Sequence, residues 1–200
     1  MLKTDGIVIG TYNAKKKSEI KEILIGIPVK LIDLEEFDNP PSINEDGITF
    51  KDNAIKKATE LANFCKTRVM ADDSGLEIDA LGGRPGIYSA RYCGEDTGYE
   101  EKCLKILEEL KEISFNERTA RFRCAIALAE PGKLLFAVEA GCEGNIDSKP
   151  RGTHGFGYDP IFYVPEYKRT MAELEPEVKN QISHRGLALR LFKEKLKELV

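Results

Sequence analysis

The spacing of apolar residues along the chain switches between two periods, and this switching constrains the fold more than any other feature. Residues 6–10, GIVIG, form a short β-rich run between glycines, which predicts a buried strand. The next segment carries an apolar stripe with helical spacing, at Ile20, Ile23, Leu24 and Ile27. Residues 29–34, VKLIDL, then alternate as in a second strand. The chain therefore begins with a strand, a helix and a strand.

Later segments repeat both patterns. Helical spacing returns from residue 49, over 99–110 and over 186–200. A strand is predicted at 68–71, where it ends at two aspartates, and further strands are predicted at 120–129 and 134–146. Polar or glycine-rich loops are predicted at 35–47, 81–86 and 149–165.

The order of these elements indicates the fold class. Helices alternate with strands at first, whereas hairpin-like strands follow one another in the middle, which predicts an α/β architecture with a mixed sheet. The chain has 200 residues, no internal repeat and no linker, so we expect a single domain over residues 1–200.

Composition excludes several classes of protein. The net charge of −4 gives no electrostatic reason to expect a nucleic acid or a membrane surface as partner. No run approaches the ~18 apolar residues of a membrane helix, and MLKTDGIVIGTYN lacks the apolar segment of a signal peptide. Five cysteines without C-x-x-C spacing predict neither a disulfide framework nor a zinc site. We therefore expect a protein of the reducing cytoplasm.

The first candidate site is TYNAKK, residues 11–16, between the strand at 6–10 and the following helix. A strand-to-helix turn aims backbone N–H groups and the positive end of a helix at one point, which suits phosphate, and the lysines add charge. The stretch is also compatible with a plain helix start in which Asn13 is the N-cap and the lysines are solvated. It is not a P-loop, because no G-x-x-x-x-G-K-[ST] motif occurs.

The second candidate is the pair Asp72 and Asp73. Two carboxylates at a strand end suit Mg²⁺, which takes one or two carboxylates together with waters and substrate phosphates. Glu45 joins such a site if the loop at 35–47 folds back. The alternative is an exposed turn or a helix N-cap, where Asp and Ser are common.

The third and fourth candidates lie near the C-terminal end. RGTHGFGYDP, residues 151–160, has three glycines that permit close approach of a ligand, and its aromatic rings offer flat surfaces for a base. It is also compatible with a tight turn whose aromatic side chains enter the core. KNQISHRG, residues 179–186, groups cationic side chains suited to phosphate and base edges, or else forms a solvated helix cap. Together the four stretches fit a magnesium nucleotide.

At this point the motifs become recognisable. TYNAKK, EDGITFKDNAIKKA, ADDSGLEIDALGGRPGIYSARY, GTHGFGYDPIFY and KNQISHRGLAL resemble, in order, the inosine triphosphate pyrophosphatase family. The resemblance runs from about residue 11 to residue 189. It implies an elongated mixed sheet with flanking helices, in two lobes around a central cleft, and a homodimer. It also implies Mg²⁺-dependent hydrolysis of ITP, dITP and XTP to the monophosphate and pyrophosphate, which removes non-standard purine nucleotides from the nucleotide pool.

The resemblance assigns the phosphate end of the site residue by residue. The triphosphate loop is implied to comprise Thr11, Tyr12, Asn13, Ala14, Lys15 and Lys16. Glu45 and Asp73 are the implied metal ligands, and Asp73 is expected to take the proton of the attacking water. Ser74 is implied to touch the substrate, and Lys179 to contact phosphate.

The base end is assigned in the same way. The wall beside the base is implied to comprise Phe156, Gly157, Tyr158 and Asp159, with Phe156 stacking on the purine. His184 and Arg185 are implied to read the purine, and a donor such as Arg185 would pair with O6 and disfavour adenine.

Two positions depart from the family pattern. Tyr12 stands where relatives have Gly or Thr, and we expect its side chain to point away from the site without backbone strain. His154 stands where many members have glycine, and its role is left open.

Two other functions stay compatible with the sequence. One is a pyrophosphatase of broader range, acting on ordinary or modified nucleotides. The other is a regulator that binds nucleotide without turnover, although the acids Glu45 and Asp73 disfavour it. A nucleic-acid-binding module is disfavoured by the negative net charge and by the lack of an aromatic-basic array.

Overall fold

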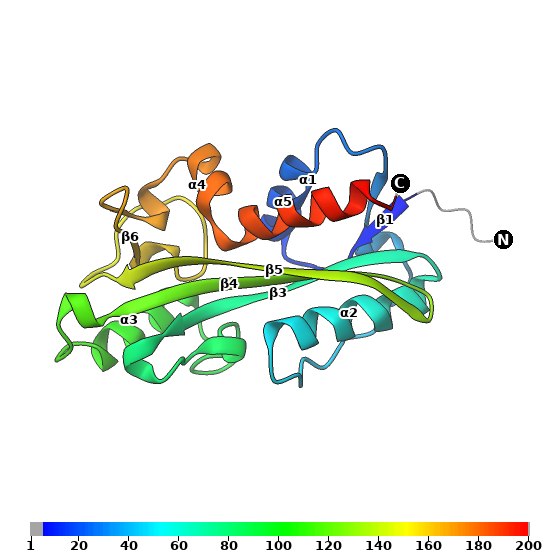
Figure 1. Cartoon of the computed structure of the whole chain (residues 1–200). Helices are drawn as coiled ribbons and strands as arrows, with labels where there is room; N and C mark the ends of the chain where they lie inside the picture. Colours follow the sequence, from blue (N-terminus) through cyan, green and yellow to red (C-terminus); the bar gives the residue numbers. More distant parts are fainter. Residues whose placement is uncertain (1–5, 200) are drawn as a thin grey trace. The chain divides into compact units, whose positions relative to one another are not determined.

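The computed structural model of the protein describes residues 6–199 (Figure 1). Its helices are α1 (Ala14–Ile23), α2 (Phe50–Cys65), α3 (Tyr99–Glu109), α4 (Pro176–Ile182) and α5 (His184–Lys197). Its strands are β1 (Gly6–Ile9), β2 (Lys30–Asp33), β3 (Arg68–Ile78), β4 (Thr119–Glu130), β5 (Lys133–Ile146), β6 (Phe162–Val164) and β7 (Arg169–Thr170).

All seven strands form one sheet in the order β2-β1-β3-β4-β5-β6-β7. The sheet is mixed, because β1 pairs in parallel with β2 and β3, whereas β6 pairs antiparallel with β5 and β7. The α/β fold class with a mixed sheet, predicted from the order of elements, is confirmed.

The chain forms two compact units of non-contiguous segments. Unit 1 contains the described residues up to Asp73, Cys124–Ala140, and those from Arg185 onward. Unit 2 contains Ser74–Arg123 and Gly141–His184. The prediction of a single domain over residues 1–200 stays a prediction.

In unit 1, α1 and α5 cover one face of the sheet and α2 covers the other (Figure 1). Ile7, Met70 and Phe192 belong to one fully buried cluster with side chains of α1 and α5. On the opposite side, α2 buries an alanine-rich face that includes Ala54, Ala58 and Ala62. Small side chains allow the helix to approach the sheet closely.

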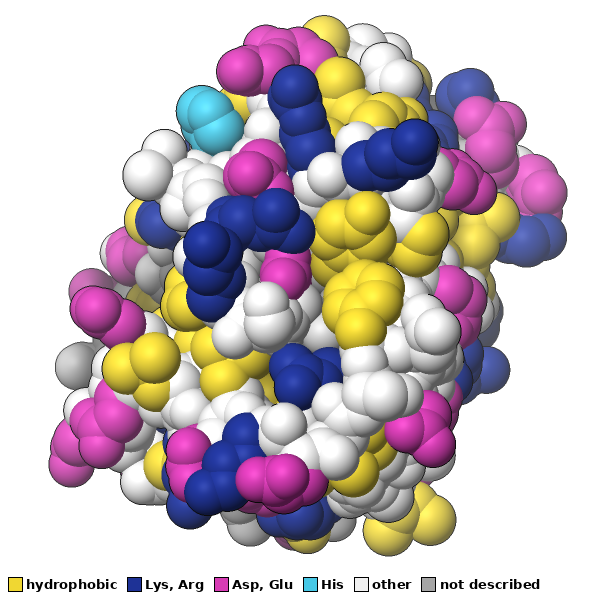
Figure 2. Space-filling model, turned by 90° about the vertical axis from the view of Figure 1, so that its left-hand side faces the viewer, with side chains coloured by type: hydrophobic (Ala, Val, Ile, Leu, Met, Phe, Trp, Pro, Cys, Tyr) yellow, Lys and Arg dark blue, Asp and Glu magenta, His cyan; other side chains and the backbone are white. Residues whose placement is uncertain are grey.

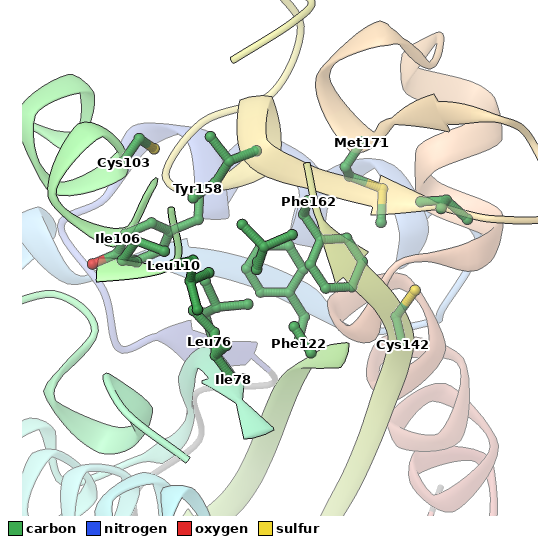
Figure 3. Close-up of a cluster of buried hydrophobic side chains, with 14 of the residues drawn as sticks. Leu76, Ile78, Cys103, Ile106, Leu110, Phe122, Cys142, Tyr158, Phe162 and Met171 are labelled. Carbon is green, nitrogen blue, oxygen red and sulfur yellow. The ribbon is translucent and has the colours of Figure 1, made fainter. Parts of the chain in front are cut away.

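In unit 2, the core gathers side chains from β3, β4, α3 and the segment around β6 (Figure 3). Leu76 and Ile78 from β3 are fully buried, as are Ile106 and Leu110 at the end of α3. The rings of Phe122 and Phe162 pack with centroids 4.4 Å apart. The loop at residues 155–159 packs on this core through the buried side chain of Tyr158.

Three predictions about the elements need correction. The strand at 68–71 does not end at the aspartates but continues to Ile78, because Leu76 and Ile78 bury their side chains in unit 2. Residues 162–164, within the predicted loop at 149–165, form β6, and residues 176–182 form α4, a helix that was not predicted. The last helix begins at His184 rather than at 186, and the predicted end at Val200 lies outside the described residues.

The surface carries side chains of mixed type, and the cysteines are free thiols. Basic, acidic and hydrophobic side chains are interspersed on the face shown in Figure 2. All five cysteines are free thiols, and only Cys93 is exposed. Within residues 6–199 no helix is long and apolar enough to cross a membrane.

Candidate functional site

The turn between β1 and α1 is a tightly bonded helix start. The side chain of Asn13 accepts hydrogen bonds from the N–H groups of Lys15 (3.0 Å) and Lys16 (3.1 Å), and its own N–H donates to the Thr11 hydroxyl at 3.2 Å. Asn13 is therefore the N-cap of α1, as expected if residues 11–16 are a plain helix start. The lysines nevertheless differ, because Lys15 is exposed whereas Lys16 forms an ion pair within unit 1.

Tyr12 occupies its position without backbone strain. Among the described residues, positive φ outside glycine occurs at Asn39, Lys66, Cys93 and Lys168. Tyr12 is not one of them, and its side chain is 55% exposed. The expected absence of backbone strain is therefore confirmed, whereas the expectation that the side chain points away from the site stays a prediction.

Asp72 lies in a buried group of ion pairs. Its carboxylate is 2.9 Å from the Lys16 ammonium and 3.5 Å from Arg185 Nε. Arg185 is also buried, and its Nη1 donates to Glu19 at 2.7 Å. Burial alone would raise the pKa of Asp72, but the charges of Lys16 and Arg185 outweigh it and hold this pKa well below its usual range. Asp72 is therefore ionised.

The environment of Asp73 shifts its pKa in the opposite direction to that of Asp72. It is 6% exposed, and its Oδ2 accepts a hydrogen bond from the Asn53 amide of α2 at 2.9 Å. Burial raises the pKa of this carboxyl; the charge of Glu45 acts in the same direction, whereas the charge of Lys57 opposes it. A raised pKa gives Asp73 a higher proton affinity than an ordinary aspartate.

The position of both residues inside β3 explains how two like charges stand side by side. Successive side chains of a strand point to opposite faces. Asp72 shares its face with Met70 and meets α1 and α5, whereas Asp73 faces α2. The two acids therefore have different nearest partners, although the charges of Lys16 and Lys57 act on both. Arg185 adds to the stabilisation of ionised Asp72, whereas burial and the charge of Glu45 raise the pKa of Asp73.

Two residues of α2 belong to this group although the sequence reading passed over them. Lys57 forms an ion pair with Glu45, so the loop that carries Glu45 folds back onto the helix, and the Asn53 amide donates a hydrogen bond to Asp73. Burial lowers the pKa of Lys57, but the charges of Asp72 and Glu45 outweigh it and leave this pKa above its ordinary value. The available signal was spacing, since residues 53 and 57 are four apart and share a helix face.

We call Lys16, Glu45, Lys57, Asp72, Asp73 and Arg185 the acid–base cluster. Two of its carboxylates, Glu45 and Asp73, are close enough for the charge of one to raise the pKa of the other. A pair of oxygen ligands suits Mg²⁺, which keeps several waters and takes further oxygens from a phosphate. Within residues 6–199 no group of three or more His, Cys, Asp or Glu residues forms a metal cage. The ligands present therefore fit Mg²⁺ held jointly with a substrate.

The second group lies in unit 2, around residues 155–159, which we call the glycine loop. Asp159 Oδ2 accepts the N–H of Phe156 at 2.8 Å and the ammonium of Lys179 at 2.8 Å. The same ammonium lies 4.9 Å from the centroid of the Phe156 ring. Gly155 has φ +75°, and a Cβ there would lie 2.1 Å from Asp159 Oδ2. The loop therefore needs glycine at 155 to close on Asp159.

Tyr158 is buried in the core of unit 2, and its expected place in the wall beside the base stays a prediction. Its ring points into the hydrophobic cluster of unit 2, and the residue is only 3% exposed (Figure 3). Its hydroxyl donates to the carbonyl of Ser89 at 2.8 Å. Phe156 is half-buried, so it is the aromatic side chain of this loop with an accessible ring.

The other predicted site residues are distributed over both units. Ser74 is half-buried in β3. His184 is buried and stacks on the ring of Phe122, with centroids 4.6 Å apart and planes at 20°. His154 is exposed, with Nε2 4.0 Å from Glu175. Arg185 directs its guanidinium to Asp72 and Glu19, and its expected role at the base stays a prediction.

The chain is similar to known proteins over nearly its whole length. The model of the Ham1 family matches residues 7–195. A dITP/XTP pyrophosphatase of Geobacter sulfurreducens is 50% identical over 190 residues, covering 95% of this chain and 96% of that protein. Another from Geobacillus kaustophilus is 50% identical over 194 residues, covering 97% and 95%.

Solved structures agree in fold. A HAM1 protein from Coxiella burnetii superimposes with a TM-score of 0.89 at 43% identity, covering 96% of this chain and 98% of its own. The Ham1 protein of Staphylococcus aureus gives a TM-score of 0.88 at 39% identity, covering 98% and 100%.

Proposed function

Because the chain belongs to the Ham1 family, we propose that it is a pyrophosphatase of non-standard purine nucleoside triphosphates such as dITP and XTP. Family membership confirms the resemblance read from the motifs. The observation that carries the proposal is the acid–base cluster, in which a buried carboxyl with raised pKa, Asp73, lies beside cations suited to phosphate. We propose that the products are the nucleoside monophosphate and pyrophosphate.

The chemistry requires a proton acceptor for the attacking water and positive charge for the phosphate oxygens. Asp73 is the proposed acceptor, since its raised pKa favours proton uptake and the Asn53 amide fixes one of its oxygens. Lys16 and Lys57 supply positive charge, and burial around Asp72 strengthens such interactions relative to water. The turn at residues 11–16 orients the triphosphate through a backbone that Asn13 holds rigid.

Glu45 and Asp73 are the proposed ligands of Mg²⁺. When bound, this ion supplies charge neutralisation on the phosphate oxygens and at the leaving pyrophosphate. The ion pair between Lys57 and Glu45 keeps the Glu45 carboxylate beside Asp73.

The glycine loop is the proposed base-side element. Phe156 offers its ring to the purine, with the Lys179 ammonium beside it. His184 and Arg185 are proposed to select O6 of hypoxanthine or xanthine, and Lys179 is proposed to reach a phosphate oxygen. That both groups of residues bind one nucleotide stays a prediction. A homodimer in the cytoplasm is proposed on the resemblance alone.

A substrate panel tests the proposal. Pyrophosphate release is measured with dITP, XTP, dGTP, dATP and dUTP, with and without Mg²⁺. We expect kcat/KM for dITP and XTP to exceed that for dATP by about a hundredfold, because two unmatched polar groups cost about 1–3 kcal/mol each. The excess over dGTP should be smaller, because guanine shares O6 with hypoxanthine and xanthine. Equal rates on all five would favour a broad-range pyrophosphatase. Tight binding of dITP without release of pyrophosphate would favour a regulator.

A further inference from the structure

The first turn of α3 contains a buried cation that the proposed reaction does not use. Lys102 is 2% exposed, although lysine rarely lies inside a protein. Its ammonium donates to the carbonyl of Ala90 and lies 5.0 Å from the centroid of the Tyr99 ring. A buried ammonium is tolerated when such contacts replace water. Lys102 therefore fixes the ring of Tyr99 and ties α3 to the segment containing Ala90.

Tyr99 in turn contacts the glycine loop. Its ring meets Tyr158 edge to face, with centroids 5.3 Å apart and planes at 88°. An atom added at the Gly157 Cα would lie 3.7 Å from Tyr99 Cε1, so the ring faces this glycine. Tyr99 is 39% exposed. The covered part of its ring contacts the Lys102 ammonium and Tyr158 of the loop.

Cys103, which follows Lys102 in α3, makes a second contact with the glycine loop. Cys103 Sγ donates to the Gly157 carbonyl at 3.7 Å, and Cys103 and Tyr158 lie at the same end of the core cluster in Figure 3. Gly157 and Gly155 both have positive φ, at +67° and +75°. A segment with two such glycines has wide conformational freedom, so its position depends on what packs against it.

The position of the glycine loop matters for which purine the proposed site accepts. Selection between purines that differ by one amino group requires hydrogen-bonding groups placed within about 0.5 Å. Phe156 and Asp159 are in the glycine loop, and α3 is the element that packs beside its central peptide. Tyr99 and Cys103 of α3 therefore contact the loop without belonging to the residues proposed to meet the substrate.

We infer that Lys102, acting through the ring of Tyr99, is a positioning residue that holds the glycine loop in place and thereby sets selectivity between hypoxanthine and guanine nucleotides. The inference rests on the proposed function for its selectivity part. Its structural part, the restraint of residues 155–159, stands independently.

The experiment compares Lys102→Met and Tyr99→Leu with two matched controls. Lys105→Met removes an exposed ammonium from the same helix, and Tyr99→Phe keeps the ring. For each variant, kcat/KM is measured with dITP and dGTP, hydrogen–deuterium exchange is measured in the peptide covering residues 154–160, and the melting temperature is recorded.

We expect the ratio of kcat/KM for dITP to that for dGTP to fall about tenfold in Lys102→Met and Tyr99→Leu, and to stay near wild type in both controls. Exchange in the loop peptide should be faster in the first two variants alone. Tyr99→Leu retains an apolar side chain at a partly exposed position, and it keeps the test decisive if Lys102→Met does not fold.

Three results separate the inference from the proposed function. Unchanged exchange in a folded Lys102→Met or Tyr99→Leu protein overturns the inference. So does an equal fall of kcat/KM for both nucleotides, since that is the effect of lower stability alone. A wild-type protein that does not hydrolyse dITP overturns the proposed function, and the exchange comparison then still decides whether Lys102 restrains the loop.

Discussion

Asp72 and Asp73 stand at adjacent positions, yet the two carboxyl groups have pKa values shifted in opposite directions. Asp72 is ionised between Lys16 and Arg185 and serves as the anionic centre of a buried ion group. Asp73 faces α2 with a raised pKa caused first by burial. Only the second has a pKa raised above that of an ordinary aspartate, which is the direction that favours proton uptake by a general base.

Replacing Asp73 by Asn tests this assignment. We expect kcat for dITP to fall about 10²- to 10⁴-fold at saturating Mg²⁺, the range attributed to a positioned general base, while the circular dichroism spectrum stays that of wild type. Asp46→Asn is the matched control, because Asp46 is an exposed acid that pairs with Lys56 at 2.6 Å. Near wild-type turnover in Asp73→Asn would refute the assignment.

Gly155 is a second residue with a demanding geometry. Gly155→Ala places a Cβ 2.1 Å from Asp159 Oδ2, in a backbone with φ +75°. Gly83→Ala has a similar φ of +85° but open space around the added atom. We expect Gly83→Ala to lower the free energy of unfolding by about 1–2 kcal/mol. Gly155→Ala should cost about 1–3 kcal/mol more, because it breaks the hydrogen bonds of Asp159.

Urea unfolding of both variants measures this difference. Equal losses would mean that the contact between Gly155 and Asp159 is relaxed in solution. Gly155→Ala should also raise KM for dITP, whereas Gly83→Ala should not.

At the scale of elements, α1 and α2 begin with the same device. Asn13 caps α1 through the N–H groups of Lys15 and Lys16, and Thr49 caps α2 by accepting the N–H of Asp52 at 3.0 Å. Each cap satisfies donors that a helix start leaves open. The first cap also shapes the proposed phosphate turn, whereas the second lies outside the acid–base cluster.

The two caps therefore give a paired prediction. Asn13→Ala and Thr49→Ala should each lower the free energy of unfolding by about 1 kcal/mol. Only Asn13→Ala should also reduce kcat/KM for dITP, because it loosens the backbone at residues 11–16. Urea unfolding and steady-state kinetics on both variants check this, and equal kinetic effects would count against the phosphate turn.

At the scale of the whole molecule, buried thiols connect folding to alkaline pH. Burial raises the pKa of Cys103 to about 12 and that of Cys142 to about 11, from ordinary values of 9.0. Burial also raises the pKa of Tyr92 to about 12. These groups stay protonated in the folded protein while the unfolded chain loses its protons.

The sign of the effect follows from proton linkage. Because the folded pKa values are raised, the stabilisation is complete below about pH 9 and is lost as the pH rises towards 11 and 12. We expect the free energy of unfolding, measured in urea, to fall steadily from pH 9 to pH 11. The double variant Cys103→Ala, Cys142→Ala should show a shallower slope, and an unchanged slope would exclude the thiols as its cause.

Much of this protein follows from its sequence through local rules. The spacing of apolar residues predicted the main helices and the mixed α/β class, the position of Asn13 predicted the cap, and the motifs predicted the family. These features depend on neighbours a few residues apart, which share a helix face or a strand face whatever the rest of the chain does.

Tertiary structure decided the partners of these side chains. Arg185 meets Glu19 across 166 positions of sequence, Asn53 reaches Asp73 across 20, and Tyr158 turns its ring into the core while Phe156 stays half-buried. The spacing of a strand states that Asp72 and Asp73 point to opposite faces, but not which helix covers each face. That choice depends on how distant segments pack, and packing determined which aspartate is held ionised and which has the raised pKa.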